Sequence, residues 1–267
     1  MDVRKTYKLY VGGEFIRSES GRAYRSNGSA NFPRGSRKDL REAVRSARAA
    51  FSGWSARTAY NRGQILYRAA EMLDVRSAEF IELLGGGARA KREVGDAVEA
   101  LVWYAGWADK IAQVAGSVNP VSGPYFNFTI AEPTGVVGVV APHQPALGGL
   151  VRRIAPVICG GNVVVALASE TDPAPALVLG EVLATSDLPS GVVNLLSGRR
   201  AELLPWLAAH MDVNAVEVSA CTSEELREVE IRAAENVKRV AGIEEVLSPH
   251  AITAFMEMKT VWHPIGQ

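Results

Sequence analysis

The hydrophobic and polar positions near the N-terminus follow the pattern of a β-hairpin. Two short extended segments, residues 8–11 and 14–17, flank the pair Gly12 and Gly13. Glycine readily adopts the positive φ angles that a tight hairpin turn requires. The sequence therefore predicts a hairpin at the start of the chain.

Helical spacing replaces this pattern further along the chain. Ser36 and Asp39 have the spacing of a capping box, and apolar residues over 40–51 then recur on one helical face. A second helix is predicted over residues 59–84, ending at three consecutive glycines, and a third from about 93 to 114. We therefore expect three long helices in this region.

The period changes to two in the segment of residues 120–133. Phe126, Phe128 and Ile130 alternate there with Tyr125, Asn127 and Thr129. Alternation of this kind predicts a half-buried antiparallel strand.

Four short apolar runs follow, separated by stretches of helical length. They cover residues 136–140, 162–167, 192–196 and 215–218. Continuous Val-rich strands that alternate with helices indicate parallel strands covered on both faces. The predicted fold class is therefore α/β, a Rossmann-like parallel sheet with helices on both faces, plus a small antiparallel sheet.

The C-terminal region is predicted to contain one more helix and a final strand. The helix covers about residues 223–240, and the strand covers 254–263. A lone terminal strand must pair with another strand to satisfy its backbone. Two partners are open: the strand of residues 125–131, or another chain.

Composition narrows the classes of function. The chain has 267 residues, with 29 basic and 29 acidic side chains and a formal net charge of zero. A general nucleic-acid binder requires a positive field, so we expect no nucleic-acid partner. No apolar run approaches the length of a membrane span, and two cysteines cannot form a disulfide framework. These features predict a globular, cytoplasmic protein without a membrane partner.

Several segments resemble the N-terminal half of aldehyde dehydrogenases. The resemblance covers about residues 7–240, and residues 258–262 (MKTVW) are similar to the final strand of that family. The matching segments are KLYVGGEF at 8–15, ARAAFSGW at 47–54, YAGWADK at 104–110, EPTGVVG at 132–138 and LPSGVVN at 188–194.

This resemblance implies a division of the chain. Residues 1–116 and 132–241 correspond to a cofactor-binding, Rossmann-like domain, whereas 117–131 and 250–267 correspond to a bridging sheet used in oligomerisation. Because only 46 residues follow Cys221, we expect the catalytic domain with its nucleophilic cysteine to be absent. Cys221 and Cys159 do not match that nucleophile, and both are expected to be structural thiols.

Positions that match the cofactor and oxyanion contacts of the family are altered. The oxyanion stretch is Pro142-His143-Gln144, in which the amide of Gln144 is one methylene longer than the family's asparagine. Glu170 keeps a ribose-binding acid, but Leu167 replaces its lysine. We interpret Pro142, Gln144, Glu170 and Gly198 as vestigial positions of the cofactor and oxyanion contacts.

The phosphate-binding turn is altered most strongly. Residues 220–225 read ACTSEE, so the glycines of the family's turn are missing and two carboxylates occupy the first turn of the following helix. These carboxylates would repel a pyrophosphate. The resemblance names NAD(P) as the family cofactor, but we expect none to bind here.

Two hypotheses follow. The first is a non-catalytic aldehyde-dehydrogenase-like protein, a structural or regulatory subunit that assembles with a full-length aldehyde dehydrogenase, with itself, or with both. In the family the tail strand commonly pairs with the catalytic domain of a neighbouring subunit. The expected interface residues are Phe126, Phe128, Ile130, Met256, Met258, Val261 and Trp262. The alternative is an NAD(P)-dependent aldehyde oxidoreductase or cofactor binder with residual activity. Binding of another small molecule in the cleft also remains open.

Overall fold

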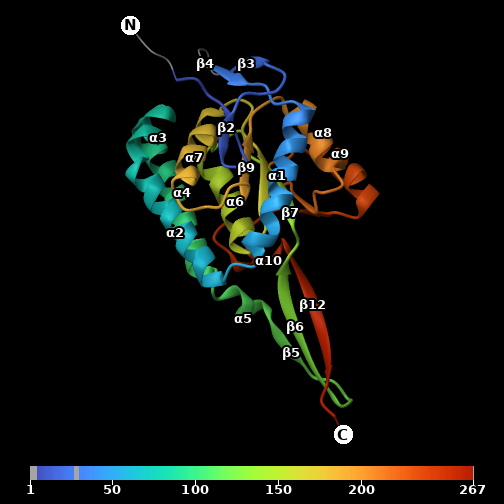
Figure 1. Cartoon of the computed structure of the whole chain (residues 1–267). Helices are drawn as coiled ribbons and strands as arrows, with labels where there is room; N and C mark the ends of the chain where they lie inside the picture. Colours follow the sequence, from blue (N-terminus) through green and yellow to red (C-terminus); the bar gives the residue numbers. More distant parts are fainter. Residues whose placement is uncertain (1–4, 27–29, 267) are drawn as a thin grey trace.

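A seven-stranded sheet forms the centre of the computed structural model, which describes residues 5–26 and 30–266 (Figure 1). The strand order is β11-β10-β7-β8-β9-β1-β2. The first five of these run parallel, whereas β1 and β2 are antiparallel to their neighbours. The strands are β7 (Val136–Val140), β8 (Val163–Leu167), β9 (Val193–Leu196), β10 (Ala215–Glu217), β11 (Arg239–Ala241), β1 (Leu9–Val11) and β2 (Glu14–Ile16). The predicted α/β fold class is confirmed.

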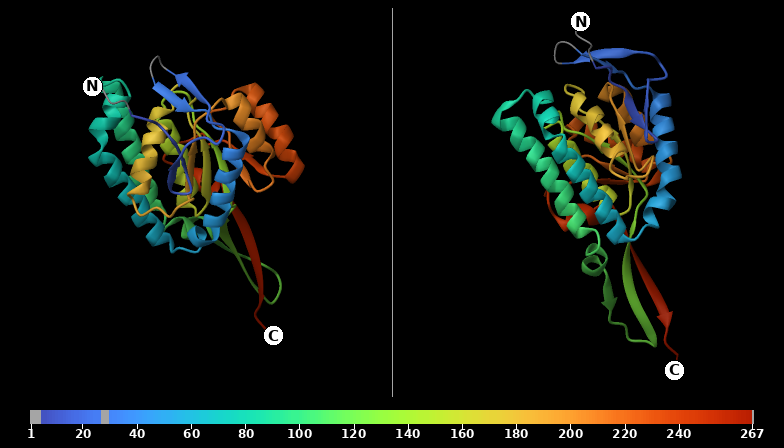
Figure 2. Two further views of the ribbon diagram at one scale, coloured as in Figure 1. Left: turned by 45° about the horizontal axis from the view of Figure 1, so that its top comes forward. Right: turned by 60° about the vertical axis from the view of Figure 1, so that its left-hand side comes forward.

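Helices cover both faces of this sheet, which explains why every residue of β7 and β8 is buried (Figures 1 and 2). One face carries α1 (Arg37–Ser55), α8 (Arg200–Ala209) and α9 (Ser223–Ala233). The other face carries α6 (Gly148–Cys159) and α7 (Ala174–Ala184), with α2 (Ala59–Val75), α3 (Ser77–Leu83) and α4 (Gly87–Trp107) outside them.

The local turn and cap predictions near the N-terminus are confirmed. Strands β1 and β2 pair antiparallel, and Gly12 and Gly13 have φ angles of +64° and +81°. The side chain of Ser36 accepts a hydrogen bond from the backbone N–H of Asp39, and the Asp39 carboxylate accepts one from the N–H of Ser36. Helix α1 therefore begins where the capping box predicts.

The two helices predicted after α1 have different boundaries in the structure. The first is interrupted at Arg76, where α2 ends and α3 begins. The second starts at Gly87, earlier than predicted, and α5 (Ile111–Ala115) is a separate short helix. The apolar spacing continues across these interruptions, so periodicity alone does not reveal them.

The helix predicted over residues 223–240 ends early. Helix α9 stops at Ala233, a 3-10 turn covers Ala234–Asn236, and Val237 adopts a left-handed conformation with φ of 54°. The chain then forms β11, which pairs with β10 at the edge of the sheet. Tertiary pairing therefore overrides the local helical pattern here.

A second sheet projects from the body (Figures 1 and 2). Its order in the described residues is β12-β6-β5, with β5 (Ser117–Asn119), β6 (Tyr125–Pro133) and β12 (Met256–Pro264) all antiparallel. The terminal strand was expected to pair either with the strand of residues 125–131 or with another chain. In the structure β12 pairs with the former, as part of β6. A smaller sheet pairs β3 (Ala23–Ser26) with β4 (Ala30–Pro33).

The faces of the projecting sheet differ from the prediction of a half-buried strand. Phe126 and Ile130 are 46% and 39% exposed, whereas the buried residue of β6 is Asn127. The apolar side of this strand therefore faces solvent. Met256 is only 5% exposed and packs in the core of the chain, so it does not contribute to the surface of the sheet.

The base of β12 is tied to the body by polar contacts. The Asn162 amide accepts a hydrogen bond from the N–H of Gly135 and donates one to the carbonyl of Phe255, each at 2.8 Å. Arg239 donates to the carbonyls of Ala254 and Met256. The preceding short helix α10 (Pro249–Thr253) packs on α6.

Within residues 5–26 and 30–266, none of the helices combines the length and the apolar character that a membrane span requires.

Candidate functional site

Four predicted positions meet at one edge of the large sheet, where its parallel strands end. Pro142 and Gln144 follow β7, Glu170 follows β8, and Gly198 follows β9. Strands β8 and β9 follow β7 on one side of the sheet, whereas β10 and β11 lie on its other side. The direction in which successive strands are added therefore reverses at β7. In open α/β sheets such a switch point is the usual place for a ligand.

A buried arginine bridges the strand ends at this switch point. Arg200, the first residue of α8, is 6% exposed. Its Nη2 donates to the carbonyl of Ala141 at 2.5 Å, and Nη1 lies 3.3 Å from both the carbonyl of Ala220 and the carboxylate of Glu225. The guanidinium therefore lies between the end of β7 and the start of α9, where a dinucleotide phosphate would approach a Rossmann-like sheet.

At the N-terminus of α9, the backbone N–H groups of Thr222 and Glu225 are already hydrogen-bonded to each other's side chains. Thr222 accepts a hydrogen bond from the N–H of Glu225 at 3.2 Å, and the Glu225 carboxylate accepts one from the N–H of Thr222 at 2.8 Å. Glu224 adds a second acid to the first turn. Negative charge at this helix end already complements the helix dipole and opposes a bound anion. This acidic helix start does not fit a pyrophosphate.

Glu170 is engaged by neighbouring residues of the chain. Its carboxylate accepts hydrogen bonds from Nη1 of Arg199 at 2.6 Å and from the N–H of Arg200 at 2.9 Å. Partial burial acts to raise the pKa of Glu170, but these hydrogen bonds and the charge of Arg199 hold it below the usual range. Glu170 therefore caps the start of α8 as a carboxylate.

Gly198 lies in a closely packed position. A Cβ atom at this position would lie 2.8 Å from Cδ1 of Leu203 and 3.2 Å from the backbone nitrogen of Gly35. The close approach of these two segments is sufficient to explain the glycine without a cofactor.

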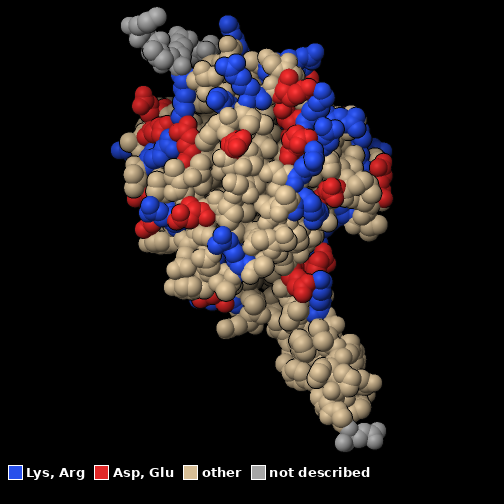
Figure 3. Space-filling model, in the orientation of Figure 1, with Lys and Arg blue, Asp and Glu red and all other residues tan. Residues whose placement is uncertain are grey.

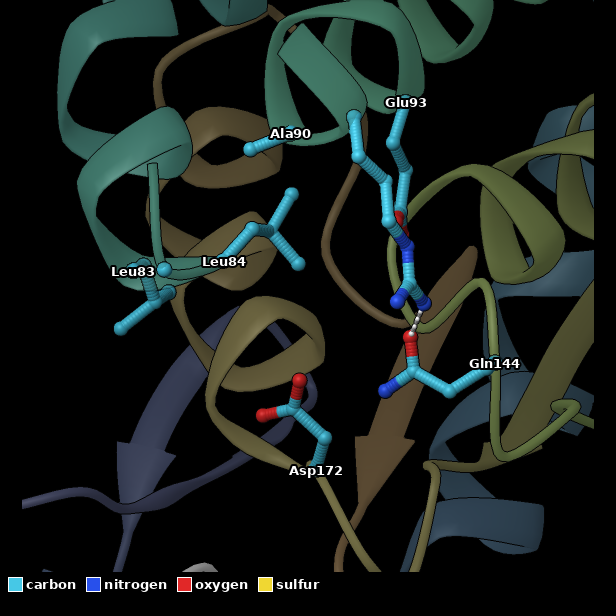
Figure 4. A pocket seen from close by; sticks show the side chains of 8 residues that line it. Leu83, Leu84, Ala90, Glu93, Gln144 and Asp172 are labelled. Carbon is cyan, nitrogen blue, oxygen red and sulfur yellow. Dashed lines mark hydrogen bonds between the residues drawn. The ribbon is translucent and has the colours of Figure 1, made fainter. Parts of the chain in front are cut away.

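Gln144 borders a cavity of about 480 Å³ beside the turn between α3 and α4 (Figure 4). Arg89 on α4 donates a hydrogen bond of 2.8 Å to the amide oxygen of Gln144. Asp172 also lines the cavity, and burial raises the pKa of its carboxyl, although the nearby amide of Gln144 acts against this. The cavity thus brings Gln144 beside Arg89 and Asp172, neither of which the sequence pattern singles out.

Glu93 in the wall of this cavity is structural. Its carboxylate accepts hydrogen bonds from the backbone N–H groups of Leu147 and Gly148, at 2.8 and 3.3 Å. These contacts hold the loop after β7 against α4.

Neither thiol is poised as a nucleophile. Burial raises the pKa of Cys159 to about 12, and its Sγ lies 3.2 Å from the carbonyl of Tyr104. Burial also raises the pKa of Cys221 to about 12, and the carboxylate of Glu225 adds to this shift. Because the thiolate is the reactive form, the raised pKa leaves both cysteines mainly as protonated thiols at neutral pH.

The projecting sheet exposes a largely uncharged surface (Figure 3). Strand pairing places one set of apolar residues on the same side, because residues directly opposite each other point to the same face. We call this set the apolar sheet face: Val118, Phe126, Phe128, Ile130 and Val261. The other side carries Met258 and Trp262, of which Trp262 is 58% exposed.

Comparison with known proteins identifies the family. The sequence model described as "Aldehyde dehydrogenase family" matches residues 19–261. The chain belongs to the aldehyde dehydrogenase family. Retinal dehydrogenase 2 of Mus musculus is 32% identical over 251 residues, covering 88% of this chain and 48% of the relative. Omega-crystallin of Enteroctopus dofleini is 28% identical over 249 residues, covering 88% and 50%.

Several solved structures share the fold. HpcC from Thermus thermophilus superposes with a TM-score of 0.83 at 29% identity, covering 89% of this chain and 48% of that chain. The NAD+ complex of aldehyde dehydrogenase from Bacillus cereus gives 0.81 at 24% identity, covering 89% and 50%. This aldehyde dehydrogenase family member therefore spans about half the length of the relatives it matches.

Arg200 is the site residue that sequence reasoning missed. Its neighbour Gly198 matches a family glycine, but the resemblance gives no role to the two arginines directly after it. A charged pair at the start of a helix, following a strand of a Rossmann-like sheet, is the signal that could have identified it.

Proposed function

We propose that this chain is a non-catalytic member of the aldehyde dehydrogenase family, a structural or regulatory subunit that assembles in the cytoplasm with a full-length aldehyde dehydrogenase. The main support for a non-catalytic role is the buried guanidinium of Arg200, which lies between the ends of β7 and β10. A dinucleotide at this position would have to displace a residue that is hydrogen-bonded to three neighbouring groups.

The acidic start of α9 and the protonated thiols support the same proposal. Glu224 and Glu225 occupy the helix end that would otherwise favour an anion. Cys159 and Cys221 both have a pKa of about 12, so neither supplies a thiolate at neutral pH. Both thiols are unpaired, which is the usual state of cysteines in the cytoplasm.

The apolar sheet face supports the assembly part of the proposal. Val118, Phe126 and Ile130 are exposed, and a contiguous apolar surface of this kind commonly marks a protein interface. The sheet projects from the body, so a partner can reach it without displacing a helix (Figure 2). We propose that a full-length aldehyde dehydrogenase covers this face.

The test is affinity purification of the intact chain from its native cells, followed by identification of co-purified proteins by mass spectrometry. We expect a full-length aldehyde dehydrogenase at near-integral stoichiometry, and we expect Phe128→Ser to abolish its recovery. Tyr60→Ser is the matched control, because Tyr60 is 66% exposed on α2, outside the sheet. Recovery of the enzyme with the Phe128→Ser variant, or its absence with the natural chain, would contradict the proposal.

The alternative is an NAD(P)-dependent aldehyde oxidoreductase or cofactor binder. The fold of the family favours it, and calorimetric titration with NAD and NADP distinguishes the two. We expect no binding heat for either nucleotide. Micromolar binding would mean that the Arg200 side chain moves away from Ala141 and Ala220, and it would favour the alternative.

A further inference from the structure

A small pocket lies between helices α1 and α8, which pack against each other on one face of the central sheet. Its volume is about 290 Å³, and its apolar lining consists of Leu40, Trp206, Ala209 and Met211. Trp206 and Met211 are 41% and 66% exposed, although both are large apolar residues. We call this feature the α1–α8 pocket. An exposed aromatic residue beside a pocket is typical of the anchor sites of protein interfaces.

The rim of the α1–α8 pocket is basic. Arg37 and Arg41 line it from successive turns of α1. Cζ of Arg37 lies 3.7 Å from the centre of the Trp206 ring, and within residues 5–26 and 30–266 no carboxylate is at ion-pair distance from this guanidinium. Arg41 and Arg45 share one carboxylate, that of Glu42, at 3.3 Å from each. Positive charge therefore exceeds negative charge at this rim.

The basic residues continue along α1 beyond the pocket. Arg37, Arg41, Arg45 and Arg48 recur at intervals of three or four residues, so they lie along one side of the helix. Figure 3 shows Lys and Arg side chains gathered along α1. The side chains of Arg41 and Arg45 are 58% and 68% exposed, which leaves them accessible to a partner. This side of α1 therefore attracts negative charge toward the pocket.

We propose that the α1–α8 pocket binds an acidic peptide segment of a partner protein. One apolar side chain of that segment occupies the pocket, and carboxylates on either side of it pair with Arg37 and Arg41. The positive rim selects acidic partners, and the apolar lining selects the side chain that is buried. The site lies on the body of the chain, so it is independent of the apolar sheet face and of the enzyme partner proposed for that face.

Separate carboxylates fit this surface better than a continuous line of phosphates. Glu42 directly follows Arg41 on α1, and the carboxylate of Asp212 lies 3.9 Å from Arg48. The phosphate backbone of a nucleic acid, or the anionic surface of a membrane, would meet these acids as well as the arginines. A peptide can place its carboxylates at the pocket rim alone and leave the two acids in contact with solvent. The observations therefore favour a peptide.

Fluorescence anisotropy with the intact chain and labelled peptides tests the proposal. The probe is Glu-Asp-Glu-Phe-Glu-Asp-Glu, and two control peptides replace its phenylalanine by serine or all its acids by lysine. We expect saturable binding of the probe and at least about tenfold weaker binding of each control, because one lacks the anchor and the other lacks the negative charge. Raising the salt concentration from about 0.05 to about 0.5 M should weaken binding of the probe, since the charges of the rim are exposed.

Variants of the chain locate the site. Arg41→Glu should weaken binding of the probe at least about tenfold, because it reverses a charge at the rim. Arg92→Glu makes the same change at an exposed position of α4, on the other face of the sheet, and should leave binding unchanged. Trp206→Ser should weaken binding of the probe without changing binding of the serine peptide. An unchanged thermal midpoint shows that each variant is folded.

Equal binding of the probe by the natural chain and by Arg41→Glu would overturn the proposal, as would no binding to the natural chain. Tighter binding of a single-stranded thymidine oligonucleotide or of phosphatidylserine vesicles would also overturn it, and would assign this surface to a nucleic acid or a membrane. These measurements contain no full-length aldehyde dehydrogenase, so their failure is separate from failure of the co-purification test.

Discussion

The guanidinium of Arg200 and the carboxylate of Glu225 lie 3.3 Å apart, although the two residues are 25 positions apart in the sequence. The pair joins the first turns of α8 and α9 at the switch point of the sheet. Arg200 is buried, whereas Glu225 keeps partial contact with solvent. The pair therefore ties the start of α8 to the start of α9.

Replacement of Arg200 by alanine should lower the free energy of unfolding by about 2–3 kcal/mol. The variant leaves the carbonyls of Ala141 and Ala220 without a donor and Glu225 without its partner. Urea titration followed by circular dichroism measures the change. Arg199→Ala is the control, since the Arg199–Glu170 pair is more exposed and should contribute at most about 1 kcal/mol. Equal effects of the two variants would contradict a buried bridging role.

Cys221 should be alkylated slowly in the folded protein. With a pKa of about 12, raised first by burial and then by Glu225, very little thiolate exists at neutral pH. We expect iodoacetamide to react at least about a hundredfold more slowly than with the unfolded chain. Mass spectrometry of timed samples measures the rate.

The contribution of Glu225 to the Cys221 pKa gives a second expectation. Glu225→Gln removes a negative charge and should lower the pKa, so alkylation should be faster at a fixed pH. Glu228→Gln lies on the same helix and should leave the rate unchanged. No difference between the two variants would assign the whole shift to burial.

Arg239 should control the order of the base of β12. It donates to the carbonyls of Ala254 and Met256 at 3.0 and 2.6 Å, and Nη2 lies 2.9 Å from the Glu257 carboxylate. Arg239→Ala should increase hydrogen exchange over residues 254–258 and lower stability by about 1–2 kcal/mol. Arg232→Ala, which removes an exposed pair within α9, is the control. Unchanged exchange at the base of β12 would contradict the anchoring role.

Lys238 should make stability depend on pH in the alkaline range. Burial lowers its pKa to about 8, although Glu235 opposes the shift, whereas the ordinary value is 10.5. Between these values the unfolded chain binds more protons than the folded chain, so stability should increase as pH rises from about 8 to 10.5. The increase should be about 2–3 kcal/mol relative to Lys238→Met.

Denaturant titrations across this pH range, performed on both proteins, isolate the effect of Lys238 from other groups. Lys91→Met on α4 provides a lysine control outside the buried region. A constant difference between the natural chain and Lys238→Met at all pH values would show that the folded pKa is unperturbed.

Local patterns predicted the hairpin at Gly12-Gly13 and the start of α1 at Ser36. Both depend on a few consecutive residues, so neighbouring segments do not change them. The predicted end of α9 is wrong for the opposite reason. Residues 234–240 have a helical pattern, but the exposed edge of β10 takes up part of this segment as β11.

The sequence by itself determined the family, the α/β fold class and the loss of the glycine turn before α9, because these features are present in residue types and their spacing. Only the tertiary structure decided that Arg200 bridges the strand ends, that β12 pairs with β6, and that Phe126 and Ile130 face solvent. These three features depend on which segments, distant in the sequence, pack against each other. A long charged side chain such as that of Arg200 can reach several partners, and the packing of the surrounding strands selects among them.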